Sequence, residues 1–441
     1  MFDAIVIGAR CAGASTAMLL ARKGHRVLVV DRSTFPSDVI STHFVWPHGT
    51  SYLNRWGLLE RVLPSTPTHN VLQLVAEDIP LTGIISPELV RRYFQQLHGD
   101  DSGVVGFYTS TRRHVLDKHL VDAAVEAGAE VREGFVVEEL LSEGGRVVGI
   151  RGRTQQGTRV EERARIIVGA DGRNSFVAQT LKLPKLDERP KCTFAYWSYF
   201  SGLAVEHAQV YRRGRLAFVL APTSFGQTLV LVFGPSEWGA EFRRDIAGNF
   251  QRAADFVNPE KGELLRTQGR REERFYGTLD QAGFLRPLHG PGWVLVGDAE
   301  CFKDQCTAIG MTHAFRDAEL ASTALDGWLS GRQPLQEAML YYENRRRSPS
   351  AAAYYDYVCT TAEMRHLSQE ELQLFALLRD NPEAIQRFFA THVDISPVSE
   401  FFEPAHLASL QEAAKGRLRE YAIFDNLEAT SRKYQQNLFA A

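Results

Sequence analysis

The stretch "DAIVIGARCAGASTAMLLARKGHRVLVVD", residues 3–31, predicts a strand, a helix and a second strand. "DAIVIG" is a short apolar run rich in β-branched residues, and Ala14, Ala17, Met18 and Ala21 then follow with helical spacing. "HRVLVVD" is a second apolar run, and it ends in an acid. A βαβ unit of about 30 residues implies a parallel sheet with a right-handed crossover.

The turn between this strand and helix keeps two of the three glycines of the dinucleotide fingerprint G-x-G-x-x-G. Gly8 is expected to make the tight turn and Gly13 to let helix and strand pack closely, while Arg10 stands where the middle glycine lets a pyrophosphate approach. Arg10 either turns away from the phosphates or folds over them as a countercharge. With Cys11 and Ala12, these residues are expected to face a pyrophosphate at the helix N-terminus.

The second strand ends at Asp31 and Arg32, which we also count as candidate cofactor-binding residues. Asp31 lies 18 residues beyond Gly13, close to the spacing at which an acid accepts a hydrogen bond from a ribose hydroxyl. An acid at this place disfavours a 2′-phosphate. The bound dinucleotide is therefore expected to be FAD or NAD rather than NADP.

Composition excludes several classes of protein. The 441 residues carry a net charge of −3 without a long Lys/Arg stripe, which argues against a nucleic-acid partner. No apolar run approaches the roughly 20 residues that span a bilayer, and the N-terminus has no signal-peptide pattern, so we expect a cytoplasmic protein without stable membrane insertion. The five cysteines are scattered and include no C-x-x-C pair, which excludes a disulfide framework and predicts no metal site. Monomer and homodimer both stay open.

The pattern of apolar residues along the chain divides it into three parts. Residues 1–75, 100–185 and 283–330 are expected to form a discontinuous, doubly wound, Rossmann-like nucleotide-binding domain. Residues 76–99 and 186–282 are expected to form an inserted antiparallel β-sheet domain, because their strands are rich in aromatic and β-branched residues. Residues 331–441 read as a helical region. The predicted fold class is α/β.

Two later motifs stand at the ends of apolar runs. "RIIVGADGRNSFVA" carries Asp171-Gly172, and "GWVLVGDAECFKDQCTAIGMTHAFRDAELAS" carries Gly297-Asp298. With the first fingerprint, and with "TRRHVLDKHL" between them, they make the chain resemble the FAD-dependent aromatic monooxygenases of the para-hydroxybenzoate hydroxylase type. The resemblance covers about the first 330 residues. Among the departures, Ala178 stands where the family commonly has an arginine, and Gln305 where it often has a proline.

The resemblance implies a non-covalent FAD and roles for several residues. Asp298, beside Gly297, would bond a ribityl hydroxyl, and Arg113 or its neighbour Arg112 would reach the FAD phosphates or ribose. Asp171 would support FAD and the route of the nicotinamide donor. The backbone around Gly310, Met311 and Thr312 would face the flavin at a helix N-terminus, where the helix dipole stabilises negative charge.

The inserted sheet is expected to form the substrate site. In "CTFAYWSYFSG", one face of the strand carries Phe194, Tyr196, Ser198 and Phe200, and the other carries Ala195, Trp197 and Tyr199. One of these faces would line a pocket over the flavin. Tyr196 is the candidate from this strand, and His43 and His48 are candidates for a base or a hydrogen-bond donor to substrate, with a structural histidine as the alternative for each.

The expected function is hydroxylation or epoxidation of an apolar, aromatic or polycyclic small molecule by FAD, NADPH or NADH, and O₂. The family mechanism would proceed through a flavin C4a-hydroperoxide. Three alternatives stay open. They are an FAD-dependent reductase or dehydrogenase of a lipid or isoprenoid, a flavin-dependent halogenase (whose W-x-W-x-I-P segment the chain lacks), and a non-catalytic flavin-binding protein.

Overall fold

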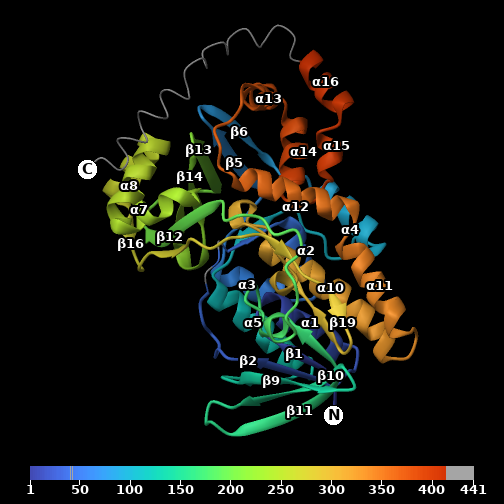
Figure 1. The fold of residues 1–441 in the computed structure, drawn as a ribbon. Coiled ribbons are helices and arrows are strands. Elements are labelled where there is room, and N and C mark those ends of the chain that lie inside the picture. Colours follow the sequence, from blue (N-terminus) through green and yellow to red (C-terminus); the bar gives the residue numbers. More distant parts are fainter. Residues whose placement is uncertain (40, 42, 414–441) are drawn as a thin grey trace.

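The computed structural model describes residues 1–39, 41 and 43–413. Figure 1 shows a lower part built around β1, β2 and α1, an upper part built around β12–β14, and an orange-to-red set of helices that closes the top and right of the molecule. The predicted α/β fold class is confirmed, and the helices at the C-terminal end are present. No helix among the described residues combines the length and the apolarity needed to cross a bilayer.

The lower part is a doubly wound sheet with the order β19-β20-β11-β1-β2-β8, in which β20 to β8 are parallel. Its strands are β1 (Phe2–Ile7), β2 (Val27–Asp31), β8 (Glu130–Glu133), β11 (Arg159–Gly169), β19 (His289–Gly290) and β20 (Trp293–Leu295). The three predicted segments form one sheet, because β11 of the second segment pairs with β1 of the first and with β20 of the third.

Each face of this sheet is covered by a different layer. Ala4 and Val6 point toward α1 (Cys11–Arg22), α5 (Arg113–Glu126) and α10 (Gly310–Leu329), whereas Ile5 and Ile7 point to the other face. That second face is covered by the meander of β9 (Val136–Glu143) and β10 (Arg146–Arg153) and by α6 (Phe176–Thr180). The burial of both faces thus accounts for the unbroken apolar run Ala4–Ile7 within β1.

The upper part is a second sheet with the order β16-β12-β15-β14-β13-β5-β6, and β17 pairs with β12. Its strands are β5 (Val71–Ala76), β6 (Ile79–Ile84), β12 (Thr193–Ser201), β13 (Ala208–Arg213), β14 (Leu216–Pro222), β15 (Thr228–Pro235), β16 (Arg270–Arg271) and β17 (Tyr276–Thr278). Two expectations need correction. The domain boundary drawn after residue 75 falls inside β5, and β5 pairs with β13 in parallel, so the sheet is mixed rather than antiparallel.

Helices pack on both faces of the second sheet. One face is covered by α7 (Gly239–Arg244), α8 (Ile246–Val257) and α9 (Pro259–Gln268). The other faces the C-terminal helices α12 (Pro349–Ala362), α13 (Gln369–Arg379) and α14 (Pro382–His392). Figure 1 places α13 and α14 beside β5 and β6. The remaining elements are α2 (Pro47–Arg55), α3 (Leu59–Val62), α4 (Pro87–His98), α11 (Leu335–Arg346), α15 (Val398–Phe401), α16 (Pro404–Ala413), β3 (Phe44–Val45), β4 (Thr68–His69), β7 (Tyr108–Ser110), β18 (Phe284–Leu285) and β21 (Cys301–Phe302).

Candidate functional site

The turn between β1 and α1 requires both of its glycines. Gly8 has φ +100°, and a Cβ there would lie 2.5 Å from the carbonyl oxygen of Ala170. A Cβ on Gly13 would lie 1.8 Å from the carbonyl oxygen of Gly8. Asp31 closes the turn from the end of β2, since its carboxylate accepts the N–H of Ala9 at 2.7 Å. The first and third glycines therefore serve the turn and the close packing that the sequence predicts.

Arg10 turns toward α5. Its Nη1 donates to Asp117 Oδ2 at 2.6 Å, and its guanidinium lies 5.3 Å from the ring centroid of Phe35. Arg113 also holds Asp117, through Nε at 3.1 Å and Nη2 at 3.0 Å. Arg10, Arg113 and Asp117 thus form one charge cluster beside the start of α1, where a pyrophosphate would bind. The sequence reasoning missed Asp117, although its spacing of four residues from Arg113 on a predicted helix was a usable signal.

Cys11 is an inert thiol. Its Sγ donates to Asp117 Oδ1, and burial raises the pKa of the thiol to about 12. Arg32, by contrast, is exposed at the end of β2. Of the predicted residues around the first turn, Gly8, Arg10, Cys11, Ala12 and Gly13 lie together, and Arg32 points outward.

Asp171 and Asp298 carry carboxylate oxygens that the protein leaves without donors. Asp171 Oδ2 accepts the N–H of Phe176 at 2.6 Å, whereas its buried Oδ1 has no partner among the described residues. Asp298 follows Gly297, which has φ +65°, and it makes no hydrogen bond with any described residue. Burial raises the pKa of Asp298. Asp298 is half-buried, and its carboxylate is free to accept a hydrogen bond from a ligand hydroxyl.

The N-terminus of α10 has open space beside it. A Cβ on Gly310 would meet no atom within 4 Å, while Met311 and Thr312 are buried. Thr312 has a structural partner, because its Oγ1 accepts the N–H of Trp46 at 3.1 Å. The free N–H groups at the starts of α1 and α10, the unsatisfied Asp298 and the cluster around Asp117 together fit the diphosphate, ribityl and flavin parts of FAD.

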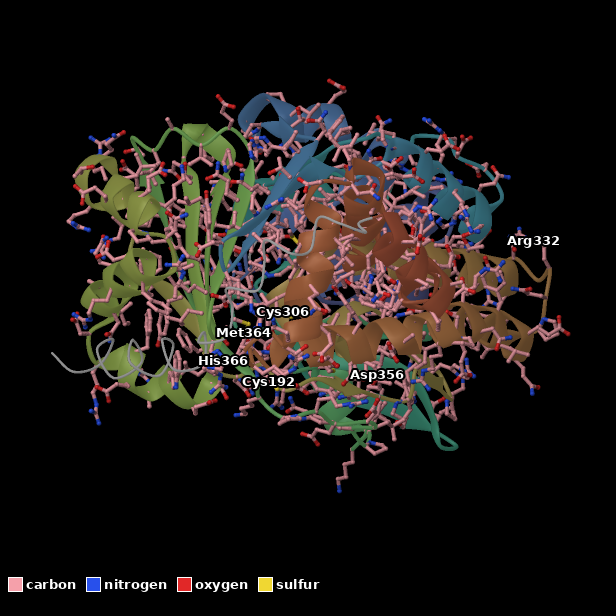
Figure 2. All side chains as sticks on the ribbon, turned by 90° about the horizontal axis from the view of Figure 1, so that it is seen from above. Cys192, Cys306, Arg332, Asp356, Met364 and His366 are labelled. Carbon is pink, nitrogen blue, oxygen red and sulfur yellow. The ribbon has the colours of Figure 1, made fainter. Side chains whose placement is uncertain are left out.

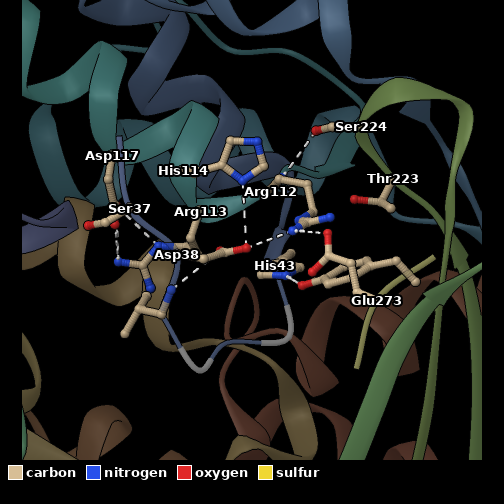
Figure 3. A network of polar contacts seen from close by, with 12 residues as sticks. Ser37, Asp38, His43, Arg112, Arg113, His114, Asp117, Thr223, Ser224 and Glu273 are labelled. Carbon is tan, nitrogen blue, oxygen red and sulfur yellow. Dashed lines mark hydrogen bonds and ion pairs between the residues drawn. The ribbon is translucent and has the colours of Figure 1, made fainter. Parts of the chain in front are cut away.

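Figure 3 shows a polar network that joins three parts of the chain. Arg112 donates to Asp38 Oδ2 at 2.7 Å and to Glu273 Oε1 at 2.9 Å, and its guanidinium lies 3.5 Å from the ring centroid of Tyr199. His43 Nε2 is hydrogen bonded to the Tyr199 hydroxyl. The segment after β2, the start of α5 and the second sheet are therefore held together.

The candidate histidines are both uncharged at neutral pH. Burial lowers the pKa of His43 to about 3 and that of His48 to about 3. His48 packs edge-on against Tyr93, and both of its ring nitrogens lack hydrogen-bond partners among the described residues. Neither histidine lines the cavity described below.

Tyr196 lies on the face of β12 that is turned away from this cavity. Its ring stacks on Phe242 of α7 at 5.3 Å between centroids, and it packs in one cluster with Phe194 and Phe200. Ala195, Trp197 and Tyr199 belong to the opposite face. The predicted alternation is thus present, but the structure places Tyr196 in the core beneath α7 and α8 rather than beside a substrate.

A cavity of about 350 Å³ separates the second sheet from the C-terminal helices. Phe44, Trp46 and residues 304–308, which precede α10, form one side. The sheet forms another, and Tyr357, Phe375, Phe388 and Phe389 close it from α12–α14. Figure 2 labels Cys306 and Met364, which both line the cavity. The cavity therefore borders the expected flavin loop and has mainly apolar walls.

Asp304 is a buried acid in this wall. It accepts from Thr193 Oγ1 at 2.6 Å and from the Cys306 N–H at 3.0 Å. Burial nevertheless raises its pKa to about 6. Ala308 completes the loop with φ +53°, a left-handed conformation that directs the chain into α10.

Comparison with known proteins identifies the cofactor domain. Residues 1–216 match the family model described as an FAD binding domain. FixC of Escherichia coli K12 is 30% identical over 194 residues, which are 42% of this chain and 40% of FixC. The match thus spans well under half the length of FixC. Digeranylgeranylglycerophospholipid reductase 2 of Methanopyrus kandleri is 28% identical over 313 residues, 68% of this chain and 70% of that protein.

Solved structures agree with the fold. The flavin-dependent brominase Bmp2 superposes with a TM-score of 0.74 at 17% identity, over 95% of this chain and 99% of that one. The comparisons confirm the expected FAD-binding domain and the fold.

Proposed function

We propose, from the premise that residues 1–216 belong to the FAD-binding-domain family, that the protein is a monooxygenase. It would take electrons from NADPH or NADH and insert one atom of O₂ into an apolar small molecule. The observation that carries the proposal is the mainly apolar cavity bordered by residues 304–308, because apolar walls beside a redox cofactor limit the access of water to the reaction.

FAD, when bound, supplies the electron transfer and oxygen chemistry that no side chain provides. Asp298 would accept a hydrogen bond from its ribityl chain, and Arg10 and Arg113 would face its diphosphate through the cluster on Asp117. The N–H groups at the start of α10 would face negative charge on the flavin. Phe44 and Trp46 close the cavity on the side of the FAD-binding domain.

The His43–Tyr199 pair would act by positioning. Burial keeps His43 neutral, and burial also raises the pKa of Tyr199, so their hydrogen bond joins two neutral groups at pH 7. Arg112 above the Tyr199 ring adds a cation–π contact. The pair would thereby fix the segment that leads to Phe44 and Trp46.

A second candidate function is reduction of a carbon–carbon double bond in an isoprenoid or another lipid. The match to the archaeal reductase, which covers 68% of this chain, favours it, and the apolar walls of the cavity suit such a substrate as well. Halogenation has only the likeness of fold in its favour.

The proposal is tested with the purified FAD-loaded protein and a panel of phenols, quinones and isoprenoid lipids. Under argon, NADPH or NADH should bleach the flavin absorbance, and one of the compounds should accelerate the bleaching. After oxygen is admitted, a product heavier by 16 mass units supports hydroxylation. A product heavier by two mass units, formed without oxygen, supports the reductase instead.

A further inference from the structure

The wall that the second sheet gives to the cavity contains one charged residue. β5, β13, β14 and β15 contribute Leu72, Leu74, Ala76, Val210, Ala217, Val219, Leu231 and Phe233, all of them apolar, and Arg212. A guanidinium in such a wall is expensive to bury unless it is paired.

Strand alternation fixes the direction of Arg212. Tyr211 packs beneath α8 on the far face of the sheet, and Arg213 forms an ion pair with Asp78 outside the cavity. Arg212 lies between Ala76 of β5 and Ala217 of β14, its direct neighbours in register. These two small side chains leave room for the guanidinium on the cavity face.

The protein gives Arg212 no carboxylate partner within ion-pair distance among the described residues. Its Nη2 donates to the carbonyl oxygen of Arg365, and its buried Nε has no hydrogen-bond partner there. The nearby Glu371 is held by both terminal nitrogens of Arg365, at 2.6 Å and 2.8 Å. Glu77 accepts the N–H of Gly214 at 2.9 Å. Burial lowers the pKa of Arg212, in keeping with an unpaired cation.

We propose that the cavity takes an amphipathic carboxylate and that Arg212 binds its carboxyl group. The planar guanidinium can donate parallel hydrogen bonds to a carboxylate, and among the described residues only its Nη2 has a protein acceptor. The apolar body of the ligand would lie along Leu74, Val210 and Val219. This assignment rests on the proposed function for the identity of the cavity as the substrate site.

The position of Arg212 orients such a ligand. Ala208 starts β13 beside the FAD-binding domain, where its N–H donates to the Tyr108 hydroxyl at 3.1 Å. Arg212 follows four residues later, about 13 Å further along the strand at roughly 3.3 Å per residue. The carboxylate would therefore lie away from the FAD-binding domain, and the apolar end would point toward Trp46 and Ala308.

The test uses calorimetric titration of the FAD-loaded protein with 2-naphthoate and with its neutral analogue 2-naphthamide. The wild-type protein should bind the carboxylate at least about tenfold more tightly than the amide, as expected for a charge-assisted hydrogen bond. Arg212→Met should remove this preference and leave the amide affinity within about threefold, whereas Arg212→Lys should keep part of it. Arg213→Met is the matched control, because it removes a neighbouring arginine on the other face.

The assignment is overturned if Arg212→Met weakens both ligands equally or neither, or if the wild-type protein binds neither ligand or prefers the amide. FAD content and melting temperature show whether Arg212→Met is folded. If it is not, the comparison of Arg212→Lys with Arg212→Gln replaces it, and equal affinities of these two variants for 2-naphthoate would overturn the assignment. No nicotinamide or turnover enters the titration, so a failure of the monooxygenase proposal would leave its result unchanged.

Discussion

Replacing Asp298 by Asn should change FAD binding and apoprotein stability in opposite directions. In the protein without FAD, the Asp298 side chain is half-buried and makes no hydrogen bond with a described residue, and its desolvation raises the pKa of the carboxyl group. Neutralising it removes the cost of partly desolvating an unpaired charge. In the FAD complex, the same carboxylate would accept a hydrogen bond from the ribityl chain, and Asn is the weaker acceptor.

The expected change in FAD affinity follows from the hydrogen bond between Asp298 and the ribityl chain. A hydrogen bond contributes about 1.5–3 kcal/mol with a charged acceptor and about 0.5–1.5 kcal/mol with a neutral one, so the dissociation constant of FAD should rise by roughly 5- to 12-fold. The melting temperature of the apoprotein should stay the same or increase. FAD affinity is measured by quenching of flavin fluorescence on addition of apoprotein, and Asp326→Asn on the far end of α10 is the control that should leave FAD affinity unchanged.

Two results would refute this reasoning. An unchanged FAD affinity would show that Asp298 does not contact the cofactor. A fall in apoprotein melting temperature that parallels the loss of FAD would show that Asp298 stabilises the fold through contacts of its own.

Five further changes have defined outcomes. Gly13→Ala should abolish FAD retention and lower soluble yield, because its Cβ would overlap the Gly8 carbonyl oxygen at 1.8 Å. Gly310→Ala, whose Cβ meets nothing within 4 Å, should leave the melting temperature of the apoprotein unchanged and weaken FAD binding. A normal FAD affinity of Gly310→Ala would place the flavin elsewhere. Arg10→Ala should lower the affinity for FAD, measured by titration, while Arg113 still holds Asp117 in place. An unchanged affinity would assign Arg10 a structural role only. Tyr196→Phe should leave kcat and KM unchanged, since the ring packs under α7; a large fall in kcat would contradict its placement. Asp304→Asn should become more stable relative to the wild type as pH rises from about 4 to about 7. The pKa of Asp304 in the folded protein, about 6, exceeds the ordinary 3.8, so ionisation of this carboxyl destabilises the wild type by about 3 kcal/mol above pH 6, or by about 3 °C in melting temperature. A stability difference that does not depend on pH would exclude the raised pKa.

The sequence was sufficient for the elements whose signal is local. The apolar strands around Gly8 and Asp31, and the acids that follow later strands, predict the FAD-binding sheet because periodicity and turn chemistry act within a few residues. The same reasoning shows that β12 has two faces. It does not show which face borders the cavity, because the other face is covered by α7 and α8, which lie about 40 residues further along the chain.

The contacts that sequence reasoning missed are long-range. Tyr199 meets His43 across 156 residues, and Arg112 meets Glu273 across 161. The apolar residues of α12–α14 read as ordinary amphipathic helix, yet they close the cavity over the second sheet. Arg212 stands in a strand-like segment with no motif around it, and only the register with Ala76 and Ala217 reveals its place in the wall.

The proposed function is tested most directly by the mass of the product formed in an atmosphere of ¹⁸O₂. The FAD-loaded protein, NADPH or NADH, and the compound that accelerates flavin bleaching are incubated together, and the product is analysed by mass spectrometry. A monooxygenase predicts a product heavier by 18 mass units that carries one ¹⁸O atom. A product that carries no ¹⁸O and gains only two hydrogens, or quantitative release of hydrogen peroxide with the compound unchanged, would contradict the account.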